Sequence, residues 1–560
     1  MREIKIVNND INNINFTTSA NSNNQIINNF APPLIKKVNP LTEVEFTKKD
    51  LIGLIATTVI LFLVSYIGII NLFNFGFTIT MFLFVTFVFF YLFNKKSEGK
   101  VFNSFLYVSS LLLITSFSLN SDGLIKFISV IYLFFILVVC FTGISDNITE
   151  KDSNYYWIFD AFFKPFTKML ENIFSPFKSI KGSIKNNKLK SFSSAFIGFA
   201  VAIPVLFVII PLLSSSDIAF DAVITKMFEN TALIFSAVFI TLILAPVFYS
   251  LIFYLKKSPS LEKESIKKYN GKLAVSGINA FLISISIVYL FYLFTQLAYI
   301  VDAFKFVLPE DYTAAEFARS GFFQMAVIVF INFVILGCTA ISVKRNDLKI
   351  PKSTKSVLLF ISAFTIFYIS TAIFKMIKYI SIYGLTRLRV LTTIFMLMLA
   401  VIFIIIILKL LIERFKYVKP IIVVCTLTLL SISMVNINTV IAEYNYSAYK
   451  AGKIDIDIYQ IDSLGVSGIP VLTKLVDEED KDISFTAKEA LYFSANKVYN
   501  NAFTTNHYYN TTLTKNSVFE YNKTCLESKK ALDEFKNTHP EFNQESFEKE
   551  QNEYYVSKGW

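Results

Sequence analysis

The chain has 560 residues, of which 54% are hydrophobic and only 17% are charged, and phenylalanine alone accounts for 60 of them. Soluble proteins average about 45–50% apolar and about 25% charged residues, so this chain has too few charges to cover its apolar surface in water. Its apolar residues also come in long uninterrupted runs. These features exclude a soluble globular enzyme, a disordered protein and a disulfide-stapled secreted module, and they indicate a polytopic membrane protein.

Eleven apolar runs are long enough to cross a bilayer as helices, for which about 20 residues are needed. They are residues 51–70, 76–94, 101–118, 124–144, 192–213, 231–255, 274–300, 321–342, 356–376, 391–412 and 419–441. The short alternating segments of a membrane β-barrel are absent from the sequence. We therefore predict an all-α polytopic bundle of about eleven transmembrane helices, with a small α-rich C-terminal module.

The runs divide the chain into five parts. The first 50 residues are rich in asparagine, lack the apolar core of a signal peptide and are expected to be disordered. The predicted parts are a cytoplasmic N-terminus (1–50), a four-span membrane part (51–144), a basic amphipathic cytoplasmic segment (145–191), a seven-span membrane core (192–442) and an acidic extracytoplasmic tail (443–560).

The distribution of Lys and Arg predicts the orientation, because cytoplasmic connections carry the excess of these residues. The connections after spans two, four, six, eight and ten carry three to eight each, whereas those after spans one, three, five and seven carry at most two. This alternation predicts a multi-pass protein of the cell (plasma) membrane with a cytoplasmic N-terminus and an extracytoplasmic C-terminus.

The tail differs in composition from the rest of the chain. Residues 443–560 contain 13 basic and 19 acidic residues, although the whole chain has a net charge of +11. Helical patterns occur at 486–500, 527–537 and 542–555. The tail is therefore expected to form a small helical module outside the cell, or a partly ordered extension.

An amphipathic stretch follows the fourth span, from residue 157 to residue 180. Trp157, Phe162 and Phe166 lie on its apolar stripe, while Lys164 and Lys168 lie off it. A basic amphipathic segment beside a membrane is expected to lie in the interface, in contact with the bilayer and its anionic lipids. A helix that docks a partner is the alternative.

The search for catalytic motifs finds none. The two histidines, His507 and His539, are both in the tail, and the cysteines at 140, 338, 425 and 525 are far apart. Neither a His-based metal site nor a Ser-His-Asp relay inside the membrane is consistent with this pattern. No Gly-Lys pair has the spacing of a phosphate-binding loop. We expect no catalytic residue, metal, cofactor or nucleic-acid partner, and the question of an enzyme stays open, leaning towards none.

Polar residues inside the predicted spans are amides and hydroxyls instead of carboxylates. Such groups usually form hydrogen bonds between helices, each worth about 1 kcal/mol. They are Asn279, Gln296, Asn332, Thr371, Asn436 and Asn438. A transporter that relies on buried carboxylates is therefore disfavoured.

One outer connection breaks the charge pattern. Between spans nine and ten the sequence places Lys375, Lys378, Arg387 and Arg389, with no acidic residue nearby in the sequence. These side chains either extend from helix ends to the membrane surface or form an outward cationic patch for phosphate or carboxylate.

Other charged residues near predicted outer helix ends extend this hypothesis. Asp217 follows three serines and is expected to cap a short interfacial helix at 218–228. Glu316 and Arg319 are spaced to share one helical face, where they form either a local salt bridge or part of a vestibule. Together with Lys378, Arg387 and Arg389 they are the candidate vestibule or anion-binding residues.

Several strings resemble an uncharacterised family of bacterial multi-pass membrane proteins. They are IPVLFVIIPLLSSSD (203–217), QLAY (296–299), YTAAEFARSGFF (312–323), YGLTRLR (383–389) and the run from Tyr444 to Leu472. The family is the domain of unknown function four-one-seven-three, which is related to four-one-five-three, and the resemblance covers about residues 195–475. It implies a multi-pass membrane protein and supplies no activity.

Three functions remain in competition. The first is a non-enzymatic envelope protein whose bundle anchors the tail, which senses or binds an envelope protein partner. The second is a transporter or lipid-handling protein with an outward polar vestibule. The third, ranked last, is a membrane transferase, for which only Asp217, Asp221 and Glu316 could act as acid or base.

Overall fold

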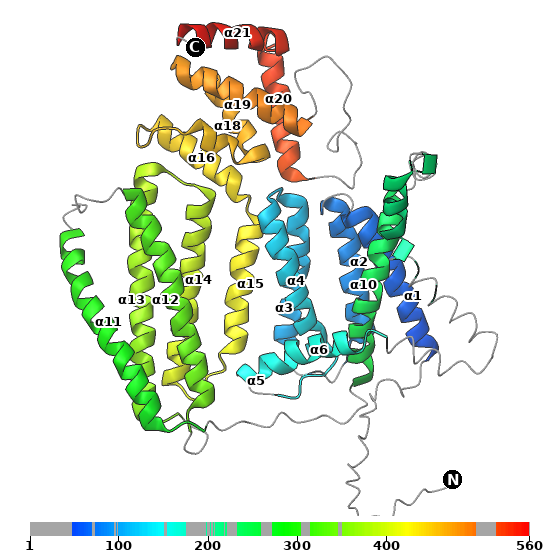
Figure 1. The fold of residues 1–560 in the computed structure, drawn as a ribbon, viewed down its shortest axis with the longest axis vertical. Coiled ribbons are helices and arrows are strands. Elements are labelled where there is room, and N and C mark those ends of the chain that lie inside the picture. The colour runs from blue at the N-terminus through cyan, green and yellow to red at the C-terminus, as the bar shows by residue number, and fades with distance from the viewer. Residues whose placement is uncertain are drawn as a thin grey trace, which may run out of the picture. The chain divides into compact units, whose positions relative to one another are not determined.

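The computed structural model describes most of the chain beyond residue 46. The described residues are 47–69, 73–94, 97, 99–150, 154–174, 198, 202, 205–206, 208–217, 219–220, 232–258, 272–303, 314–344, 350–499 and 522–558. Within these ranges the regular elements are helices, and the one β-type contact is an isolated bridge between Leu273 and Val343 (Figure 1). The predicted all-α fold is confirmed.

A first group of helices, which we call the N-terminal cluster, surrounds a core rich in aromatic residues. Its long members are α1 (Lys48–Leu63) with its π-helical continuation η2 (Val64–Ile69), α2 (Phe75–Leu92), α3 (Lys100–Leu119), α4 (Gly123–Ile144), α10 (Ala232–Lys257) and α15 (Val418–Met434). Phe84, Phe117 and Phe253 are buried at its centre. Since α10 and α15 complete this core, sequence order alone does not define the packing units.

Three short helices close one end of the N-terminal cluster. They are α5 (Tyr155–Ile158), η3 (Phe159–Phe163) and α6 (Lys164–Glu171), which pack against α4 and α10. Trp157 is only 2% exposed, and Phe162 and Phe166 pack against the same core. Lys164 and Lys168 form ion pairs with carboxylates of this segment at 3.4 and 2.7 Å. The apolar stripe therefore faces the helices; its contact with a bilayer interface stays a prediction.

A second group, the α11–α14 cluster, follows in the sequence. It consists of α11 (Val275–Ala303), α12 (Ala314–Ser342), α13 (Lys352–Tyr383) and α14 (Arg387–Leu411). Asn332 is fully buried in it, accepts a hydrogen bond from the Tyr289 hydroxyl at 2.6 Å and donates one to the Thr365 hydroxyl at 2.9 Å. This intramembrane amide thus joins three helices, as the sequence predicted.

Helix α15, a member of the N-terminal cluster, also packs against the α11–α14 cluster. It contacts α3 and α4 of the N-terminal cluster and α14 of the other. Its Thr426 and Ser433 hydroxyls form hydrogen bonds with Tyr132 at 2.8 Å and Ser129 at 3.0 Å, both on α4. The two membrane clusters are therefore joined through one helix.

The C-terminal module begins where α15 ends. Its helices are α16 (Ile437–Lys450), α17 (Ile458–Asp462), the 3-10 helix η5 (Gly465–Gly468), α18 (Ile469–Leu475), α19 (Lys481–Tyr499), α20 (Lys523–Thr538) and α21 (Gln544–Ser557). Leu472, Leu491 and Phe547 are buried in its core. The three predicted helical stretches of the tail correspond to α19, α20 and α21, so the tail is an α-rich module within the described residues.

Nine helices among the described residues are long and apolar enough to cross a membrane, and a tenth span is formed if the pair α15 and α16 is counted as one. Ten of the eleven predicted runs correspond to these helices. The run at 192–213 lies largely outside the described residues. The run at 419–441 is wrong at its end, because the chain bends by 63° between α15 and α16. Asn436 and Asn438 consequently lie at this bend.

The connections between helices sort to two ends. Those at Asn74, at 120–122 and at 384–386 contact the C-terminal module, and we call this the module end. At the opposite, lysine-rich end, Lys257 forms an ion pair with Asp50 at 2.6 Å and Lys256 donates to the backbone carbonyl of Tyr91 at 2.7 Å. The predicted orientation of these two ends relative to the cytoplasm stays a prediction.

Candidate functional site

The connection between α3 and α4 supplies the central carboxylate of the module end. Asp122 is the N-cap of α4, and its Oδ1 accepts hydrogen bonds from the backbone N–H groups of Leu124 and Ile125 at 2.9 and 3.1 Å. An N-cap carboxylate satisfies helix N–H groups that would otherwise lack partners. Asn120 accepts from the Asp122 backbone N–H at 2.9 Å, which fixes the turn.

The second oxygen of Asp122 joins three parts of the chain. Arg387, the first residue of α14, donates from Nη1 to Asp122 Oδ2 at 3.2 Å, and Asn438 of α16 donates from Nδ2 to the same oxygen at 3.0 Å. The Asp122 side chain is 1% exposed, whereas that of Arg387 is 44% exposed. The basic connection between α13 and α14 therefore has no acidic neighbour in the local sequence but has one, Asp122, in the structure.

A second set of hydrogen bonds ties α20 to the N-terminal cluster. Asn522, the N-cap of α20, donates to the backbone carbonyl of Asn120 at 3.0 Å, and the Thr524 hydroxyl donates to the carbonyl of Leu119 at 2.9 Å. Asn436 at the α15–α16 bend donates to the Thr524 hydroxyl at 2.7 Å. These bonds join residues of α20 to the α3–α4 connection, which lies more than 400 positions earlier in the sequence.

The connection between α13 and α14 is held by the module. Asn445 of α16 accepts from the backbone N–H of Leu385 and donates to its carbonyl, both at 2.8 Å, and Gln460 of α17 also donates to that carbonyl at 3.1 Å. Gly384 has φ +71°, a conformation that favours glycine, and a Cβ there would lie 2.7 Å from Asn445 Oδ1. Two of the family-like strings, 383–389 and 444–472, therefore meet here.

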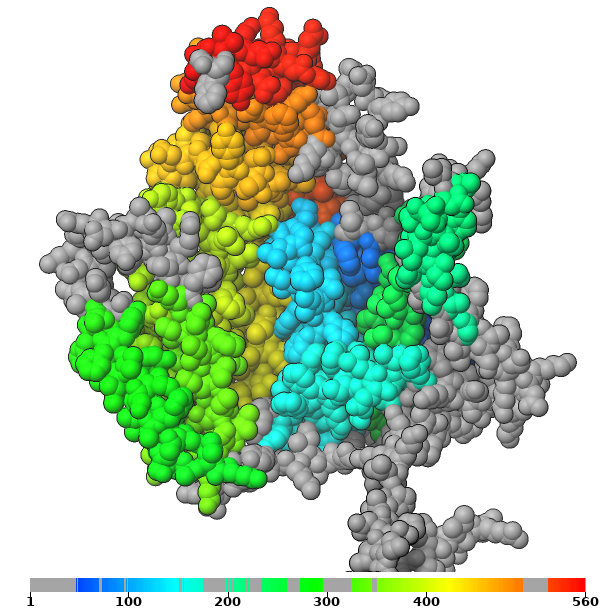
Figure 2. Space-filling model, in the orientation of Figure 1, coloured from blue at the N-terminus to red at the C-terminus, as the bar shows by residue number. Residues whose placement is uncertain are grey.

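We call this set of contacts the junction. It comprises the polar residues Asn120, Asp122, Arg387, Asn436, Asn438, Asn445, Gln460, Asn522 and Thr524, together with the Leu385 backbone. The apolar core of the module extends across it, because Ile125 of α4 and Val390 and Leu391 of α14 pack into that core. Figure 2 shows the yellow-to-red atoms of the module next to the light-blue atoms of the N-terminal cluster. The module is thus fastened to both clusters by apolar packing and by a polar network.

The candidate vestibule residues fall into two groups. Arg389 donates to the backbone carbonyls of Tyr383 and Gly384 at 2.8 and 2.6 Å, and its guanidinium stacks on the Tyr379 ring at 4.0 Å. Lys378 lies one turn before the end of α13 and is half-buried. Both arginines at the start of α14 are thus bound by the protein itself: Arg387 belongs to the junction, and Arg389 contacts the end of α13.

The remaining candidates are not brought to the junction by any described contact. The carboxylate of Asp217 accepts a hydrogen bond from the backbone N–H of Ala219 at 2.9 Å, which is the local capping bond expected there, although most of residues 218–228 lie outside the described residues. The side chains of Glu316 and Arg319 also lie outside the described part of the chain, although α12 includes both positions. A vestibule that contains them stays a prediction.

The junction offers little chemistry of bond making and breaking. It contains amides, hydroxyls, one carboxylate and one exposed guanidinium, and no group of three or more His, Cys, Asp or Glu side chains able to hold a metal occurs among the described residues. Burial raises the pKa of the Cys525 thiol, against the opposing effect of the nearby Lys126 ammonium. A thiol with a raised pKa is a poor nucleophile. The arrangement holds three helical parts together.

Sequence reasoning missed Asp122, Asn445 and Asn522. A local signal was present for Asp122 and Asn522, because Asp and Asn just before an apolar helix are typical N-caps. Nothing in the local sequence indicated that Asp122 binds a residue 265 positions away. Asn445 gave no signal beyond its place in a family-like string.

Residues 107–475 match the family described as Domain of unknown function (DUF4153). The chain belongs to this family. The expected number, four-one-seven-three, is thus wrong, and the DUF4153 match begins within α3, well before residue 195. It ends at the last residue of α18, so it includes Asp122, Arg387, Asn438 and Asn445 but not Asn522. No match was found among curated proteins or solved structures.

Proposed function

We propose that this DUF4153 protein is a non-enzymatic sensor whose C-terminal module binds an envelope partner and whose junction passes the binding event to the membrane helices. The observation that carries the proposal is the junction itself, where Asp122 of α4 contacts both Arg387 of α14 and Asn438 of the module. A simple anchor needs one connection to the membrane. Here the module contacts helices of both clusters, so a displacement of the module acts on both.

The junction also contains groups suited to a second arrangement. Asn120 Nδ2 and Asn438 Oδ1 are buried and have no hydrogen-bond partner in the described part of the chain. A buried polar group without a partner costs about 1–3 kcal/mol. A shift of the module that supplied partners to these two atoms would recover this free energy, which favours a two-state element over a rigid support.

The proposed orientation places the module outside the plasma membrane of a bacterial cell and the lysine-rich end in the cytoplasm. Support comes from the partition of basic connections between the two ends and from the bias of Lys and Arg towards the cytoplasm. An enzyme reporter that is active only outside the cytoplasm, fused after Trp560, is expected to be active. Activity of a cytoplasmic reporter at the same position would reverse the orientation.

The partner-binding face that we favour is an exposed aromatic area of the module. Tyr459 is 72% exposed, Val556 73% and its sequence neighbour Tyr555 39%. The hydrogen bond to Glu489 and, to a smaller extent, Tyr459 raise the pKa of Tyr555, which indicates that the two tyrosines lie near each other. Tyrosines exposed in this way supply large contact area with little loss of conformational entropy, and they are enriched at binding sites. We infer that this area receives the partner.

Complementation of a deletion strain tests the proposal with the full chain. The double variant Y459S/V556S removes the proposed binding face, and L526S removes an apolar side chain of α20 that is 54% exposed and serves as the matched control. R387Q loosens the junction and leaves the module core intact. A sensor predicts that Y459S/V556S and R387Q fail to restore the phenotype while L526S restores it.

The other outcomes separate the competing functions. If R387Q restores the phenotype and Y459S/V556S does not, the protein is an anchor without transmission. If both restore it, the module is not the functional part and the alternative of a transporter or lipid-handling protein gains support. Protease resistance of the module in isolated membranes shows that each variant is inserted and folded.

A further inference from the structure

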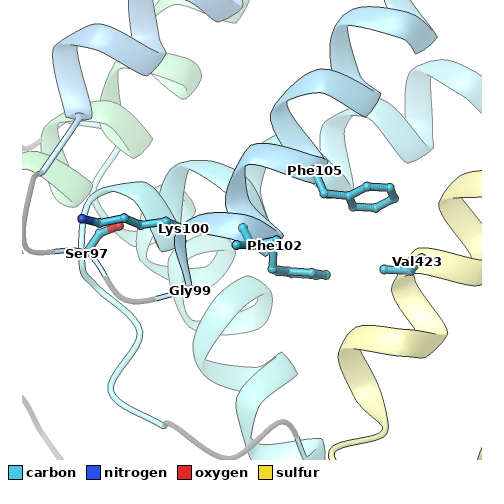
Figure 3. Close-up of a pocket in the computed structure, with 7 residues that line it drawn as sticks. Ser97, Gly99, Lys100, Phe102, Phe105 and Val423 are labelled. Carbon is cyan, nitrogen blue, oxygen red and sulfur yellow. The ribbon is translucent and has the colours of Figure 1, made fainter.

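A groove lies between α3 and α15 at the lysine-rich end, far from the junction. Its volume is about 790 Å³, and its lining consists of Ser97, Gly99, Lys100, Val101, Phe102, Phe105 and Val423. Figure 3 shows Phe102 and Phe105 pointing towards Val423 of α15, while the Lys100 side chain extends to the other side beside Ser97. The groove therefore has an apolar wall and one polar rim.

The apolar wall belongs to membrane-spanning helices. Helix α3 is one of the nine candidate spans, and α15 forms the bent candidate with α16. Val101 is 87% exposed at the groove, which is unfavourable in water but favourable against lipid chains. The material that fills such a groove in a bilayer is hydrocarbon.

The polar rim carries two ammonium groups. Lys100 follows Gly99 directly, and a Cβ placed on Gly99 would lie 3.6 Å from the Nζ of Lys419, so Lys419 reaches the same rim from α15. The Lys419 ammonium lies over the rings of Phe102 and Trp157 at 5.3 and 5.2 Å. These cation–π contacts hold the ammonium beside the groove residue Phe102.

The connection that precedes α3 is basic in its sequence. Residues 94–100 read Asn-Lys-Lys-Ser-Glu-Gly-Lys, which is three basic residues against one acidic residue. An anionic headgroup has a net negative charge that complements the ammonium groups of the rim, whereas a zwitterionic headgroup has no net charge. Basic pockets between membrane helices bind such headgroups elsewhere.

We propose that the groove is a binding site for a membrane phospholipid with a net negative headgroup. Its acyl chain lies along Phe102, Phe105 and Val423, and its phosphate lies at the rim formed by Ser97, Gly99 and Lys100, which the Lys419 ammonium also reaches. The site is independent of the proposed sensor function, because it lies at the opposite end from the junction. Each lysine is expected to contribute about a five-fold preference for the anionic lipid.

The chain provides its own reporter for this site. It has two tryptophans, and Trp157 forms an edge contact with the groove residue Phe102 at 5.8 Å between ring centroids. A W560F chain keeps only Trp157. In proteoliposomes, brominated phosphatidylglycerol should quench Trp157 fluorescence at several-fold lower mole fraction than brominated phosphatidylcholine, each relative to its unbrominated form.

Four variants on the W560F background test the assignment. K100Q/K419Q should bring the two lipids close to equal quenching, and K419R, which keeps the charge, should retain the preference. V423F fills the apolar wall and should reduce quenching by either lipid. K352Q/K355Q is the matched control, because it removes the same charge from the start of α13 and should leave the preference unchanged.

The proposal is overturned by equal quenching by the two lipids in the W560F chain. It is also overturned if K352Q/K355Q lowers the preference as much as K100Q/K419Q, because the effect would then be a general surface charge. Unchanged quenching in V423F would exclude the groove itself.

Discussion

Replacement of Asp122 is expected to destabilise the junction far more than replacement of its partner Arg387. In Asp122→Ala, the loss of the N-cap costs about 1 kcal/mol. The Nδ2 group of Asn438 is then buried without its partner, which costs about 1–3 kcal/mol. Arg387 is 44% exposed and can turn to solvent, so the ion pair adds only about 0–1 kcal/mol. The expected total is about 2–5 kcal/mol.

Two further variants separate these contributions. Arg387→Gln removes only the exposed ion pair and should cost about 0–1 kcal/mol. Asp122→Asn keeps an oxygen for the cap but places an amide opposite two donors, so its cost should lie between the other two. The free energy of unfolding of the purified full chain in mild detergent, measured for each variant, tests this order of costs. The double variant Asp122→Ala/Arg387→Gln gives the coupling energy.

We expect a coupling energy below about 1 kcal/mol, because Arg387 is 44% exposed. A cost for Arg387→Gln equal to that of Asp122→Ala would refute it. Such a result would mean that the ion pair, and not the cap and the Asn438 contact, holds the module to the membrane helices.

Two other predictions concern single contacts. Gly384→Ala should lower the free energy of unfolding more than Gly452→Ala in the same assay. Both glycines have positive φ, but only Gly384 has a close neighbour, Asn445. Equal losses would contradict this prediction. Lys257→Gln should lower the free energy of unfolding by about 3 kcal/mol. It leaves the Asp50 carboxylate, which is 4% exposed, without its charge partner at the lysine-rich end. A loss under 1 kcal/mol would show that water reaches this pair.

The membrane fold could be predicted from the sequence because its signals are local. A run of about 20 apolar residues determines a helix without reference to the rest of the chain, and lysines at helix ends indicate which ends lie together. The one wrong boundary, in the run at 419–441, arose because apolar residues continue through Val435 into the module. Asn436 was the local sign of the break, since it caps α16 by accepting from the Thr439 N–H.

The junction could not be predicted, because its contacts are between residues hundreds of positions apart. The local sequence around Arg387 gives a cationic patch, and only the fold shows that Asp122 is beside it. Asn522 likewise reads as a helix cap in an acidic tail, whereas in the structure it also fastens that tail to α3. Charge patterns thus indicated where polar side chains gather but not which ones pair.

Helix α15 and the Asp122–Arg387 ion pair both link α4 of the N-terminal cluster to α14 of the α11–α14 cluster. Helix α15 packs against α4 and α14 within the membrane, and the Asp122–Arg387 pair joins the ends of those same two helices beside the bend into α16. In the proposed sensor, a rotation of the module turns α16 about the bend and pulls on Asp122 through Asn438. Because Arg387 shares the same carboxylate oxygen, such a pull weakens the ion pair first, while α15 and the apolar core of the module still link the two clusters. Sensing by this protein would consist of that separation of α4 from α14.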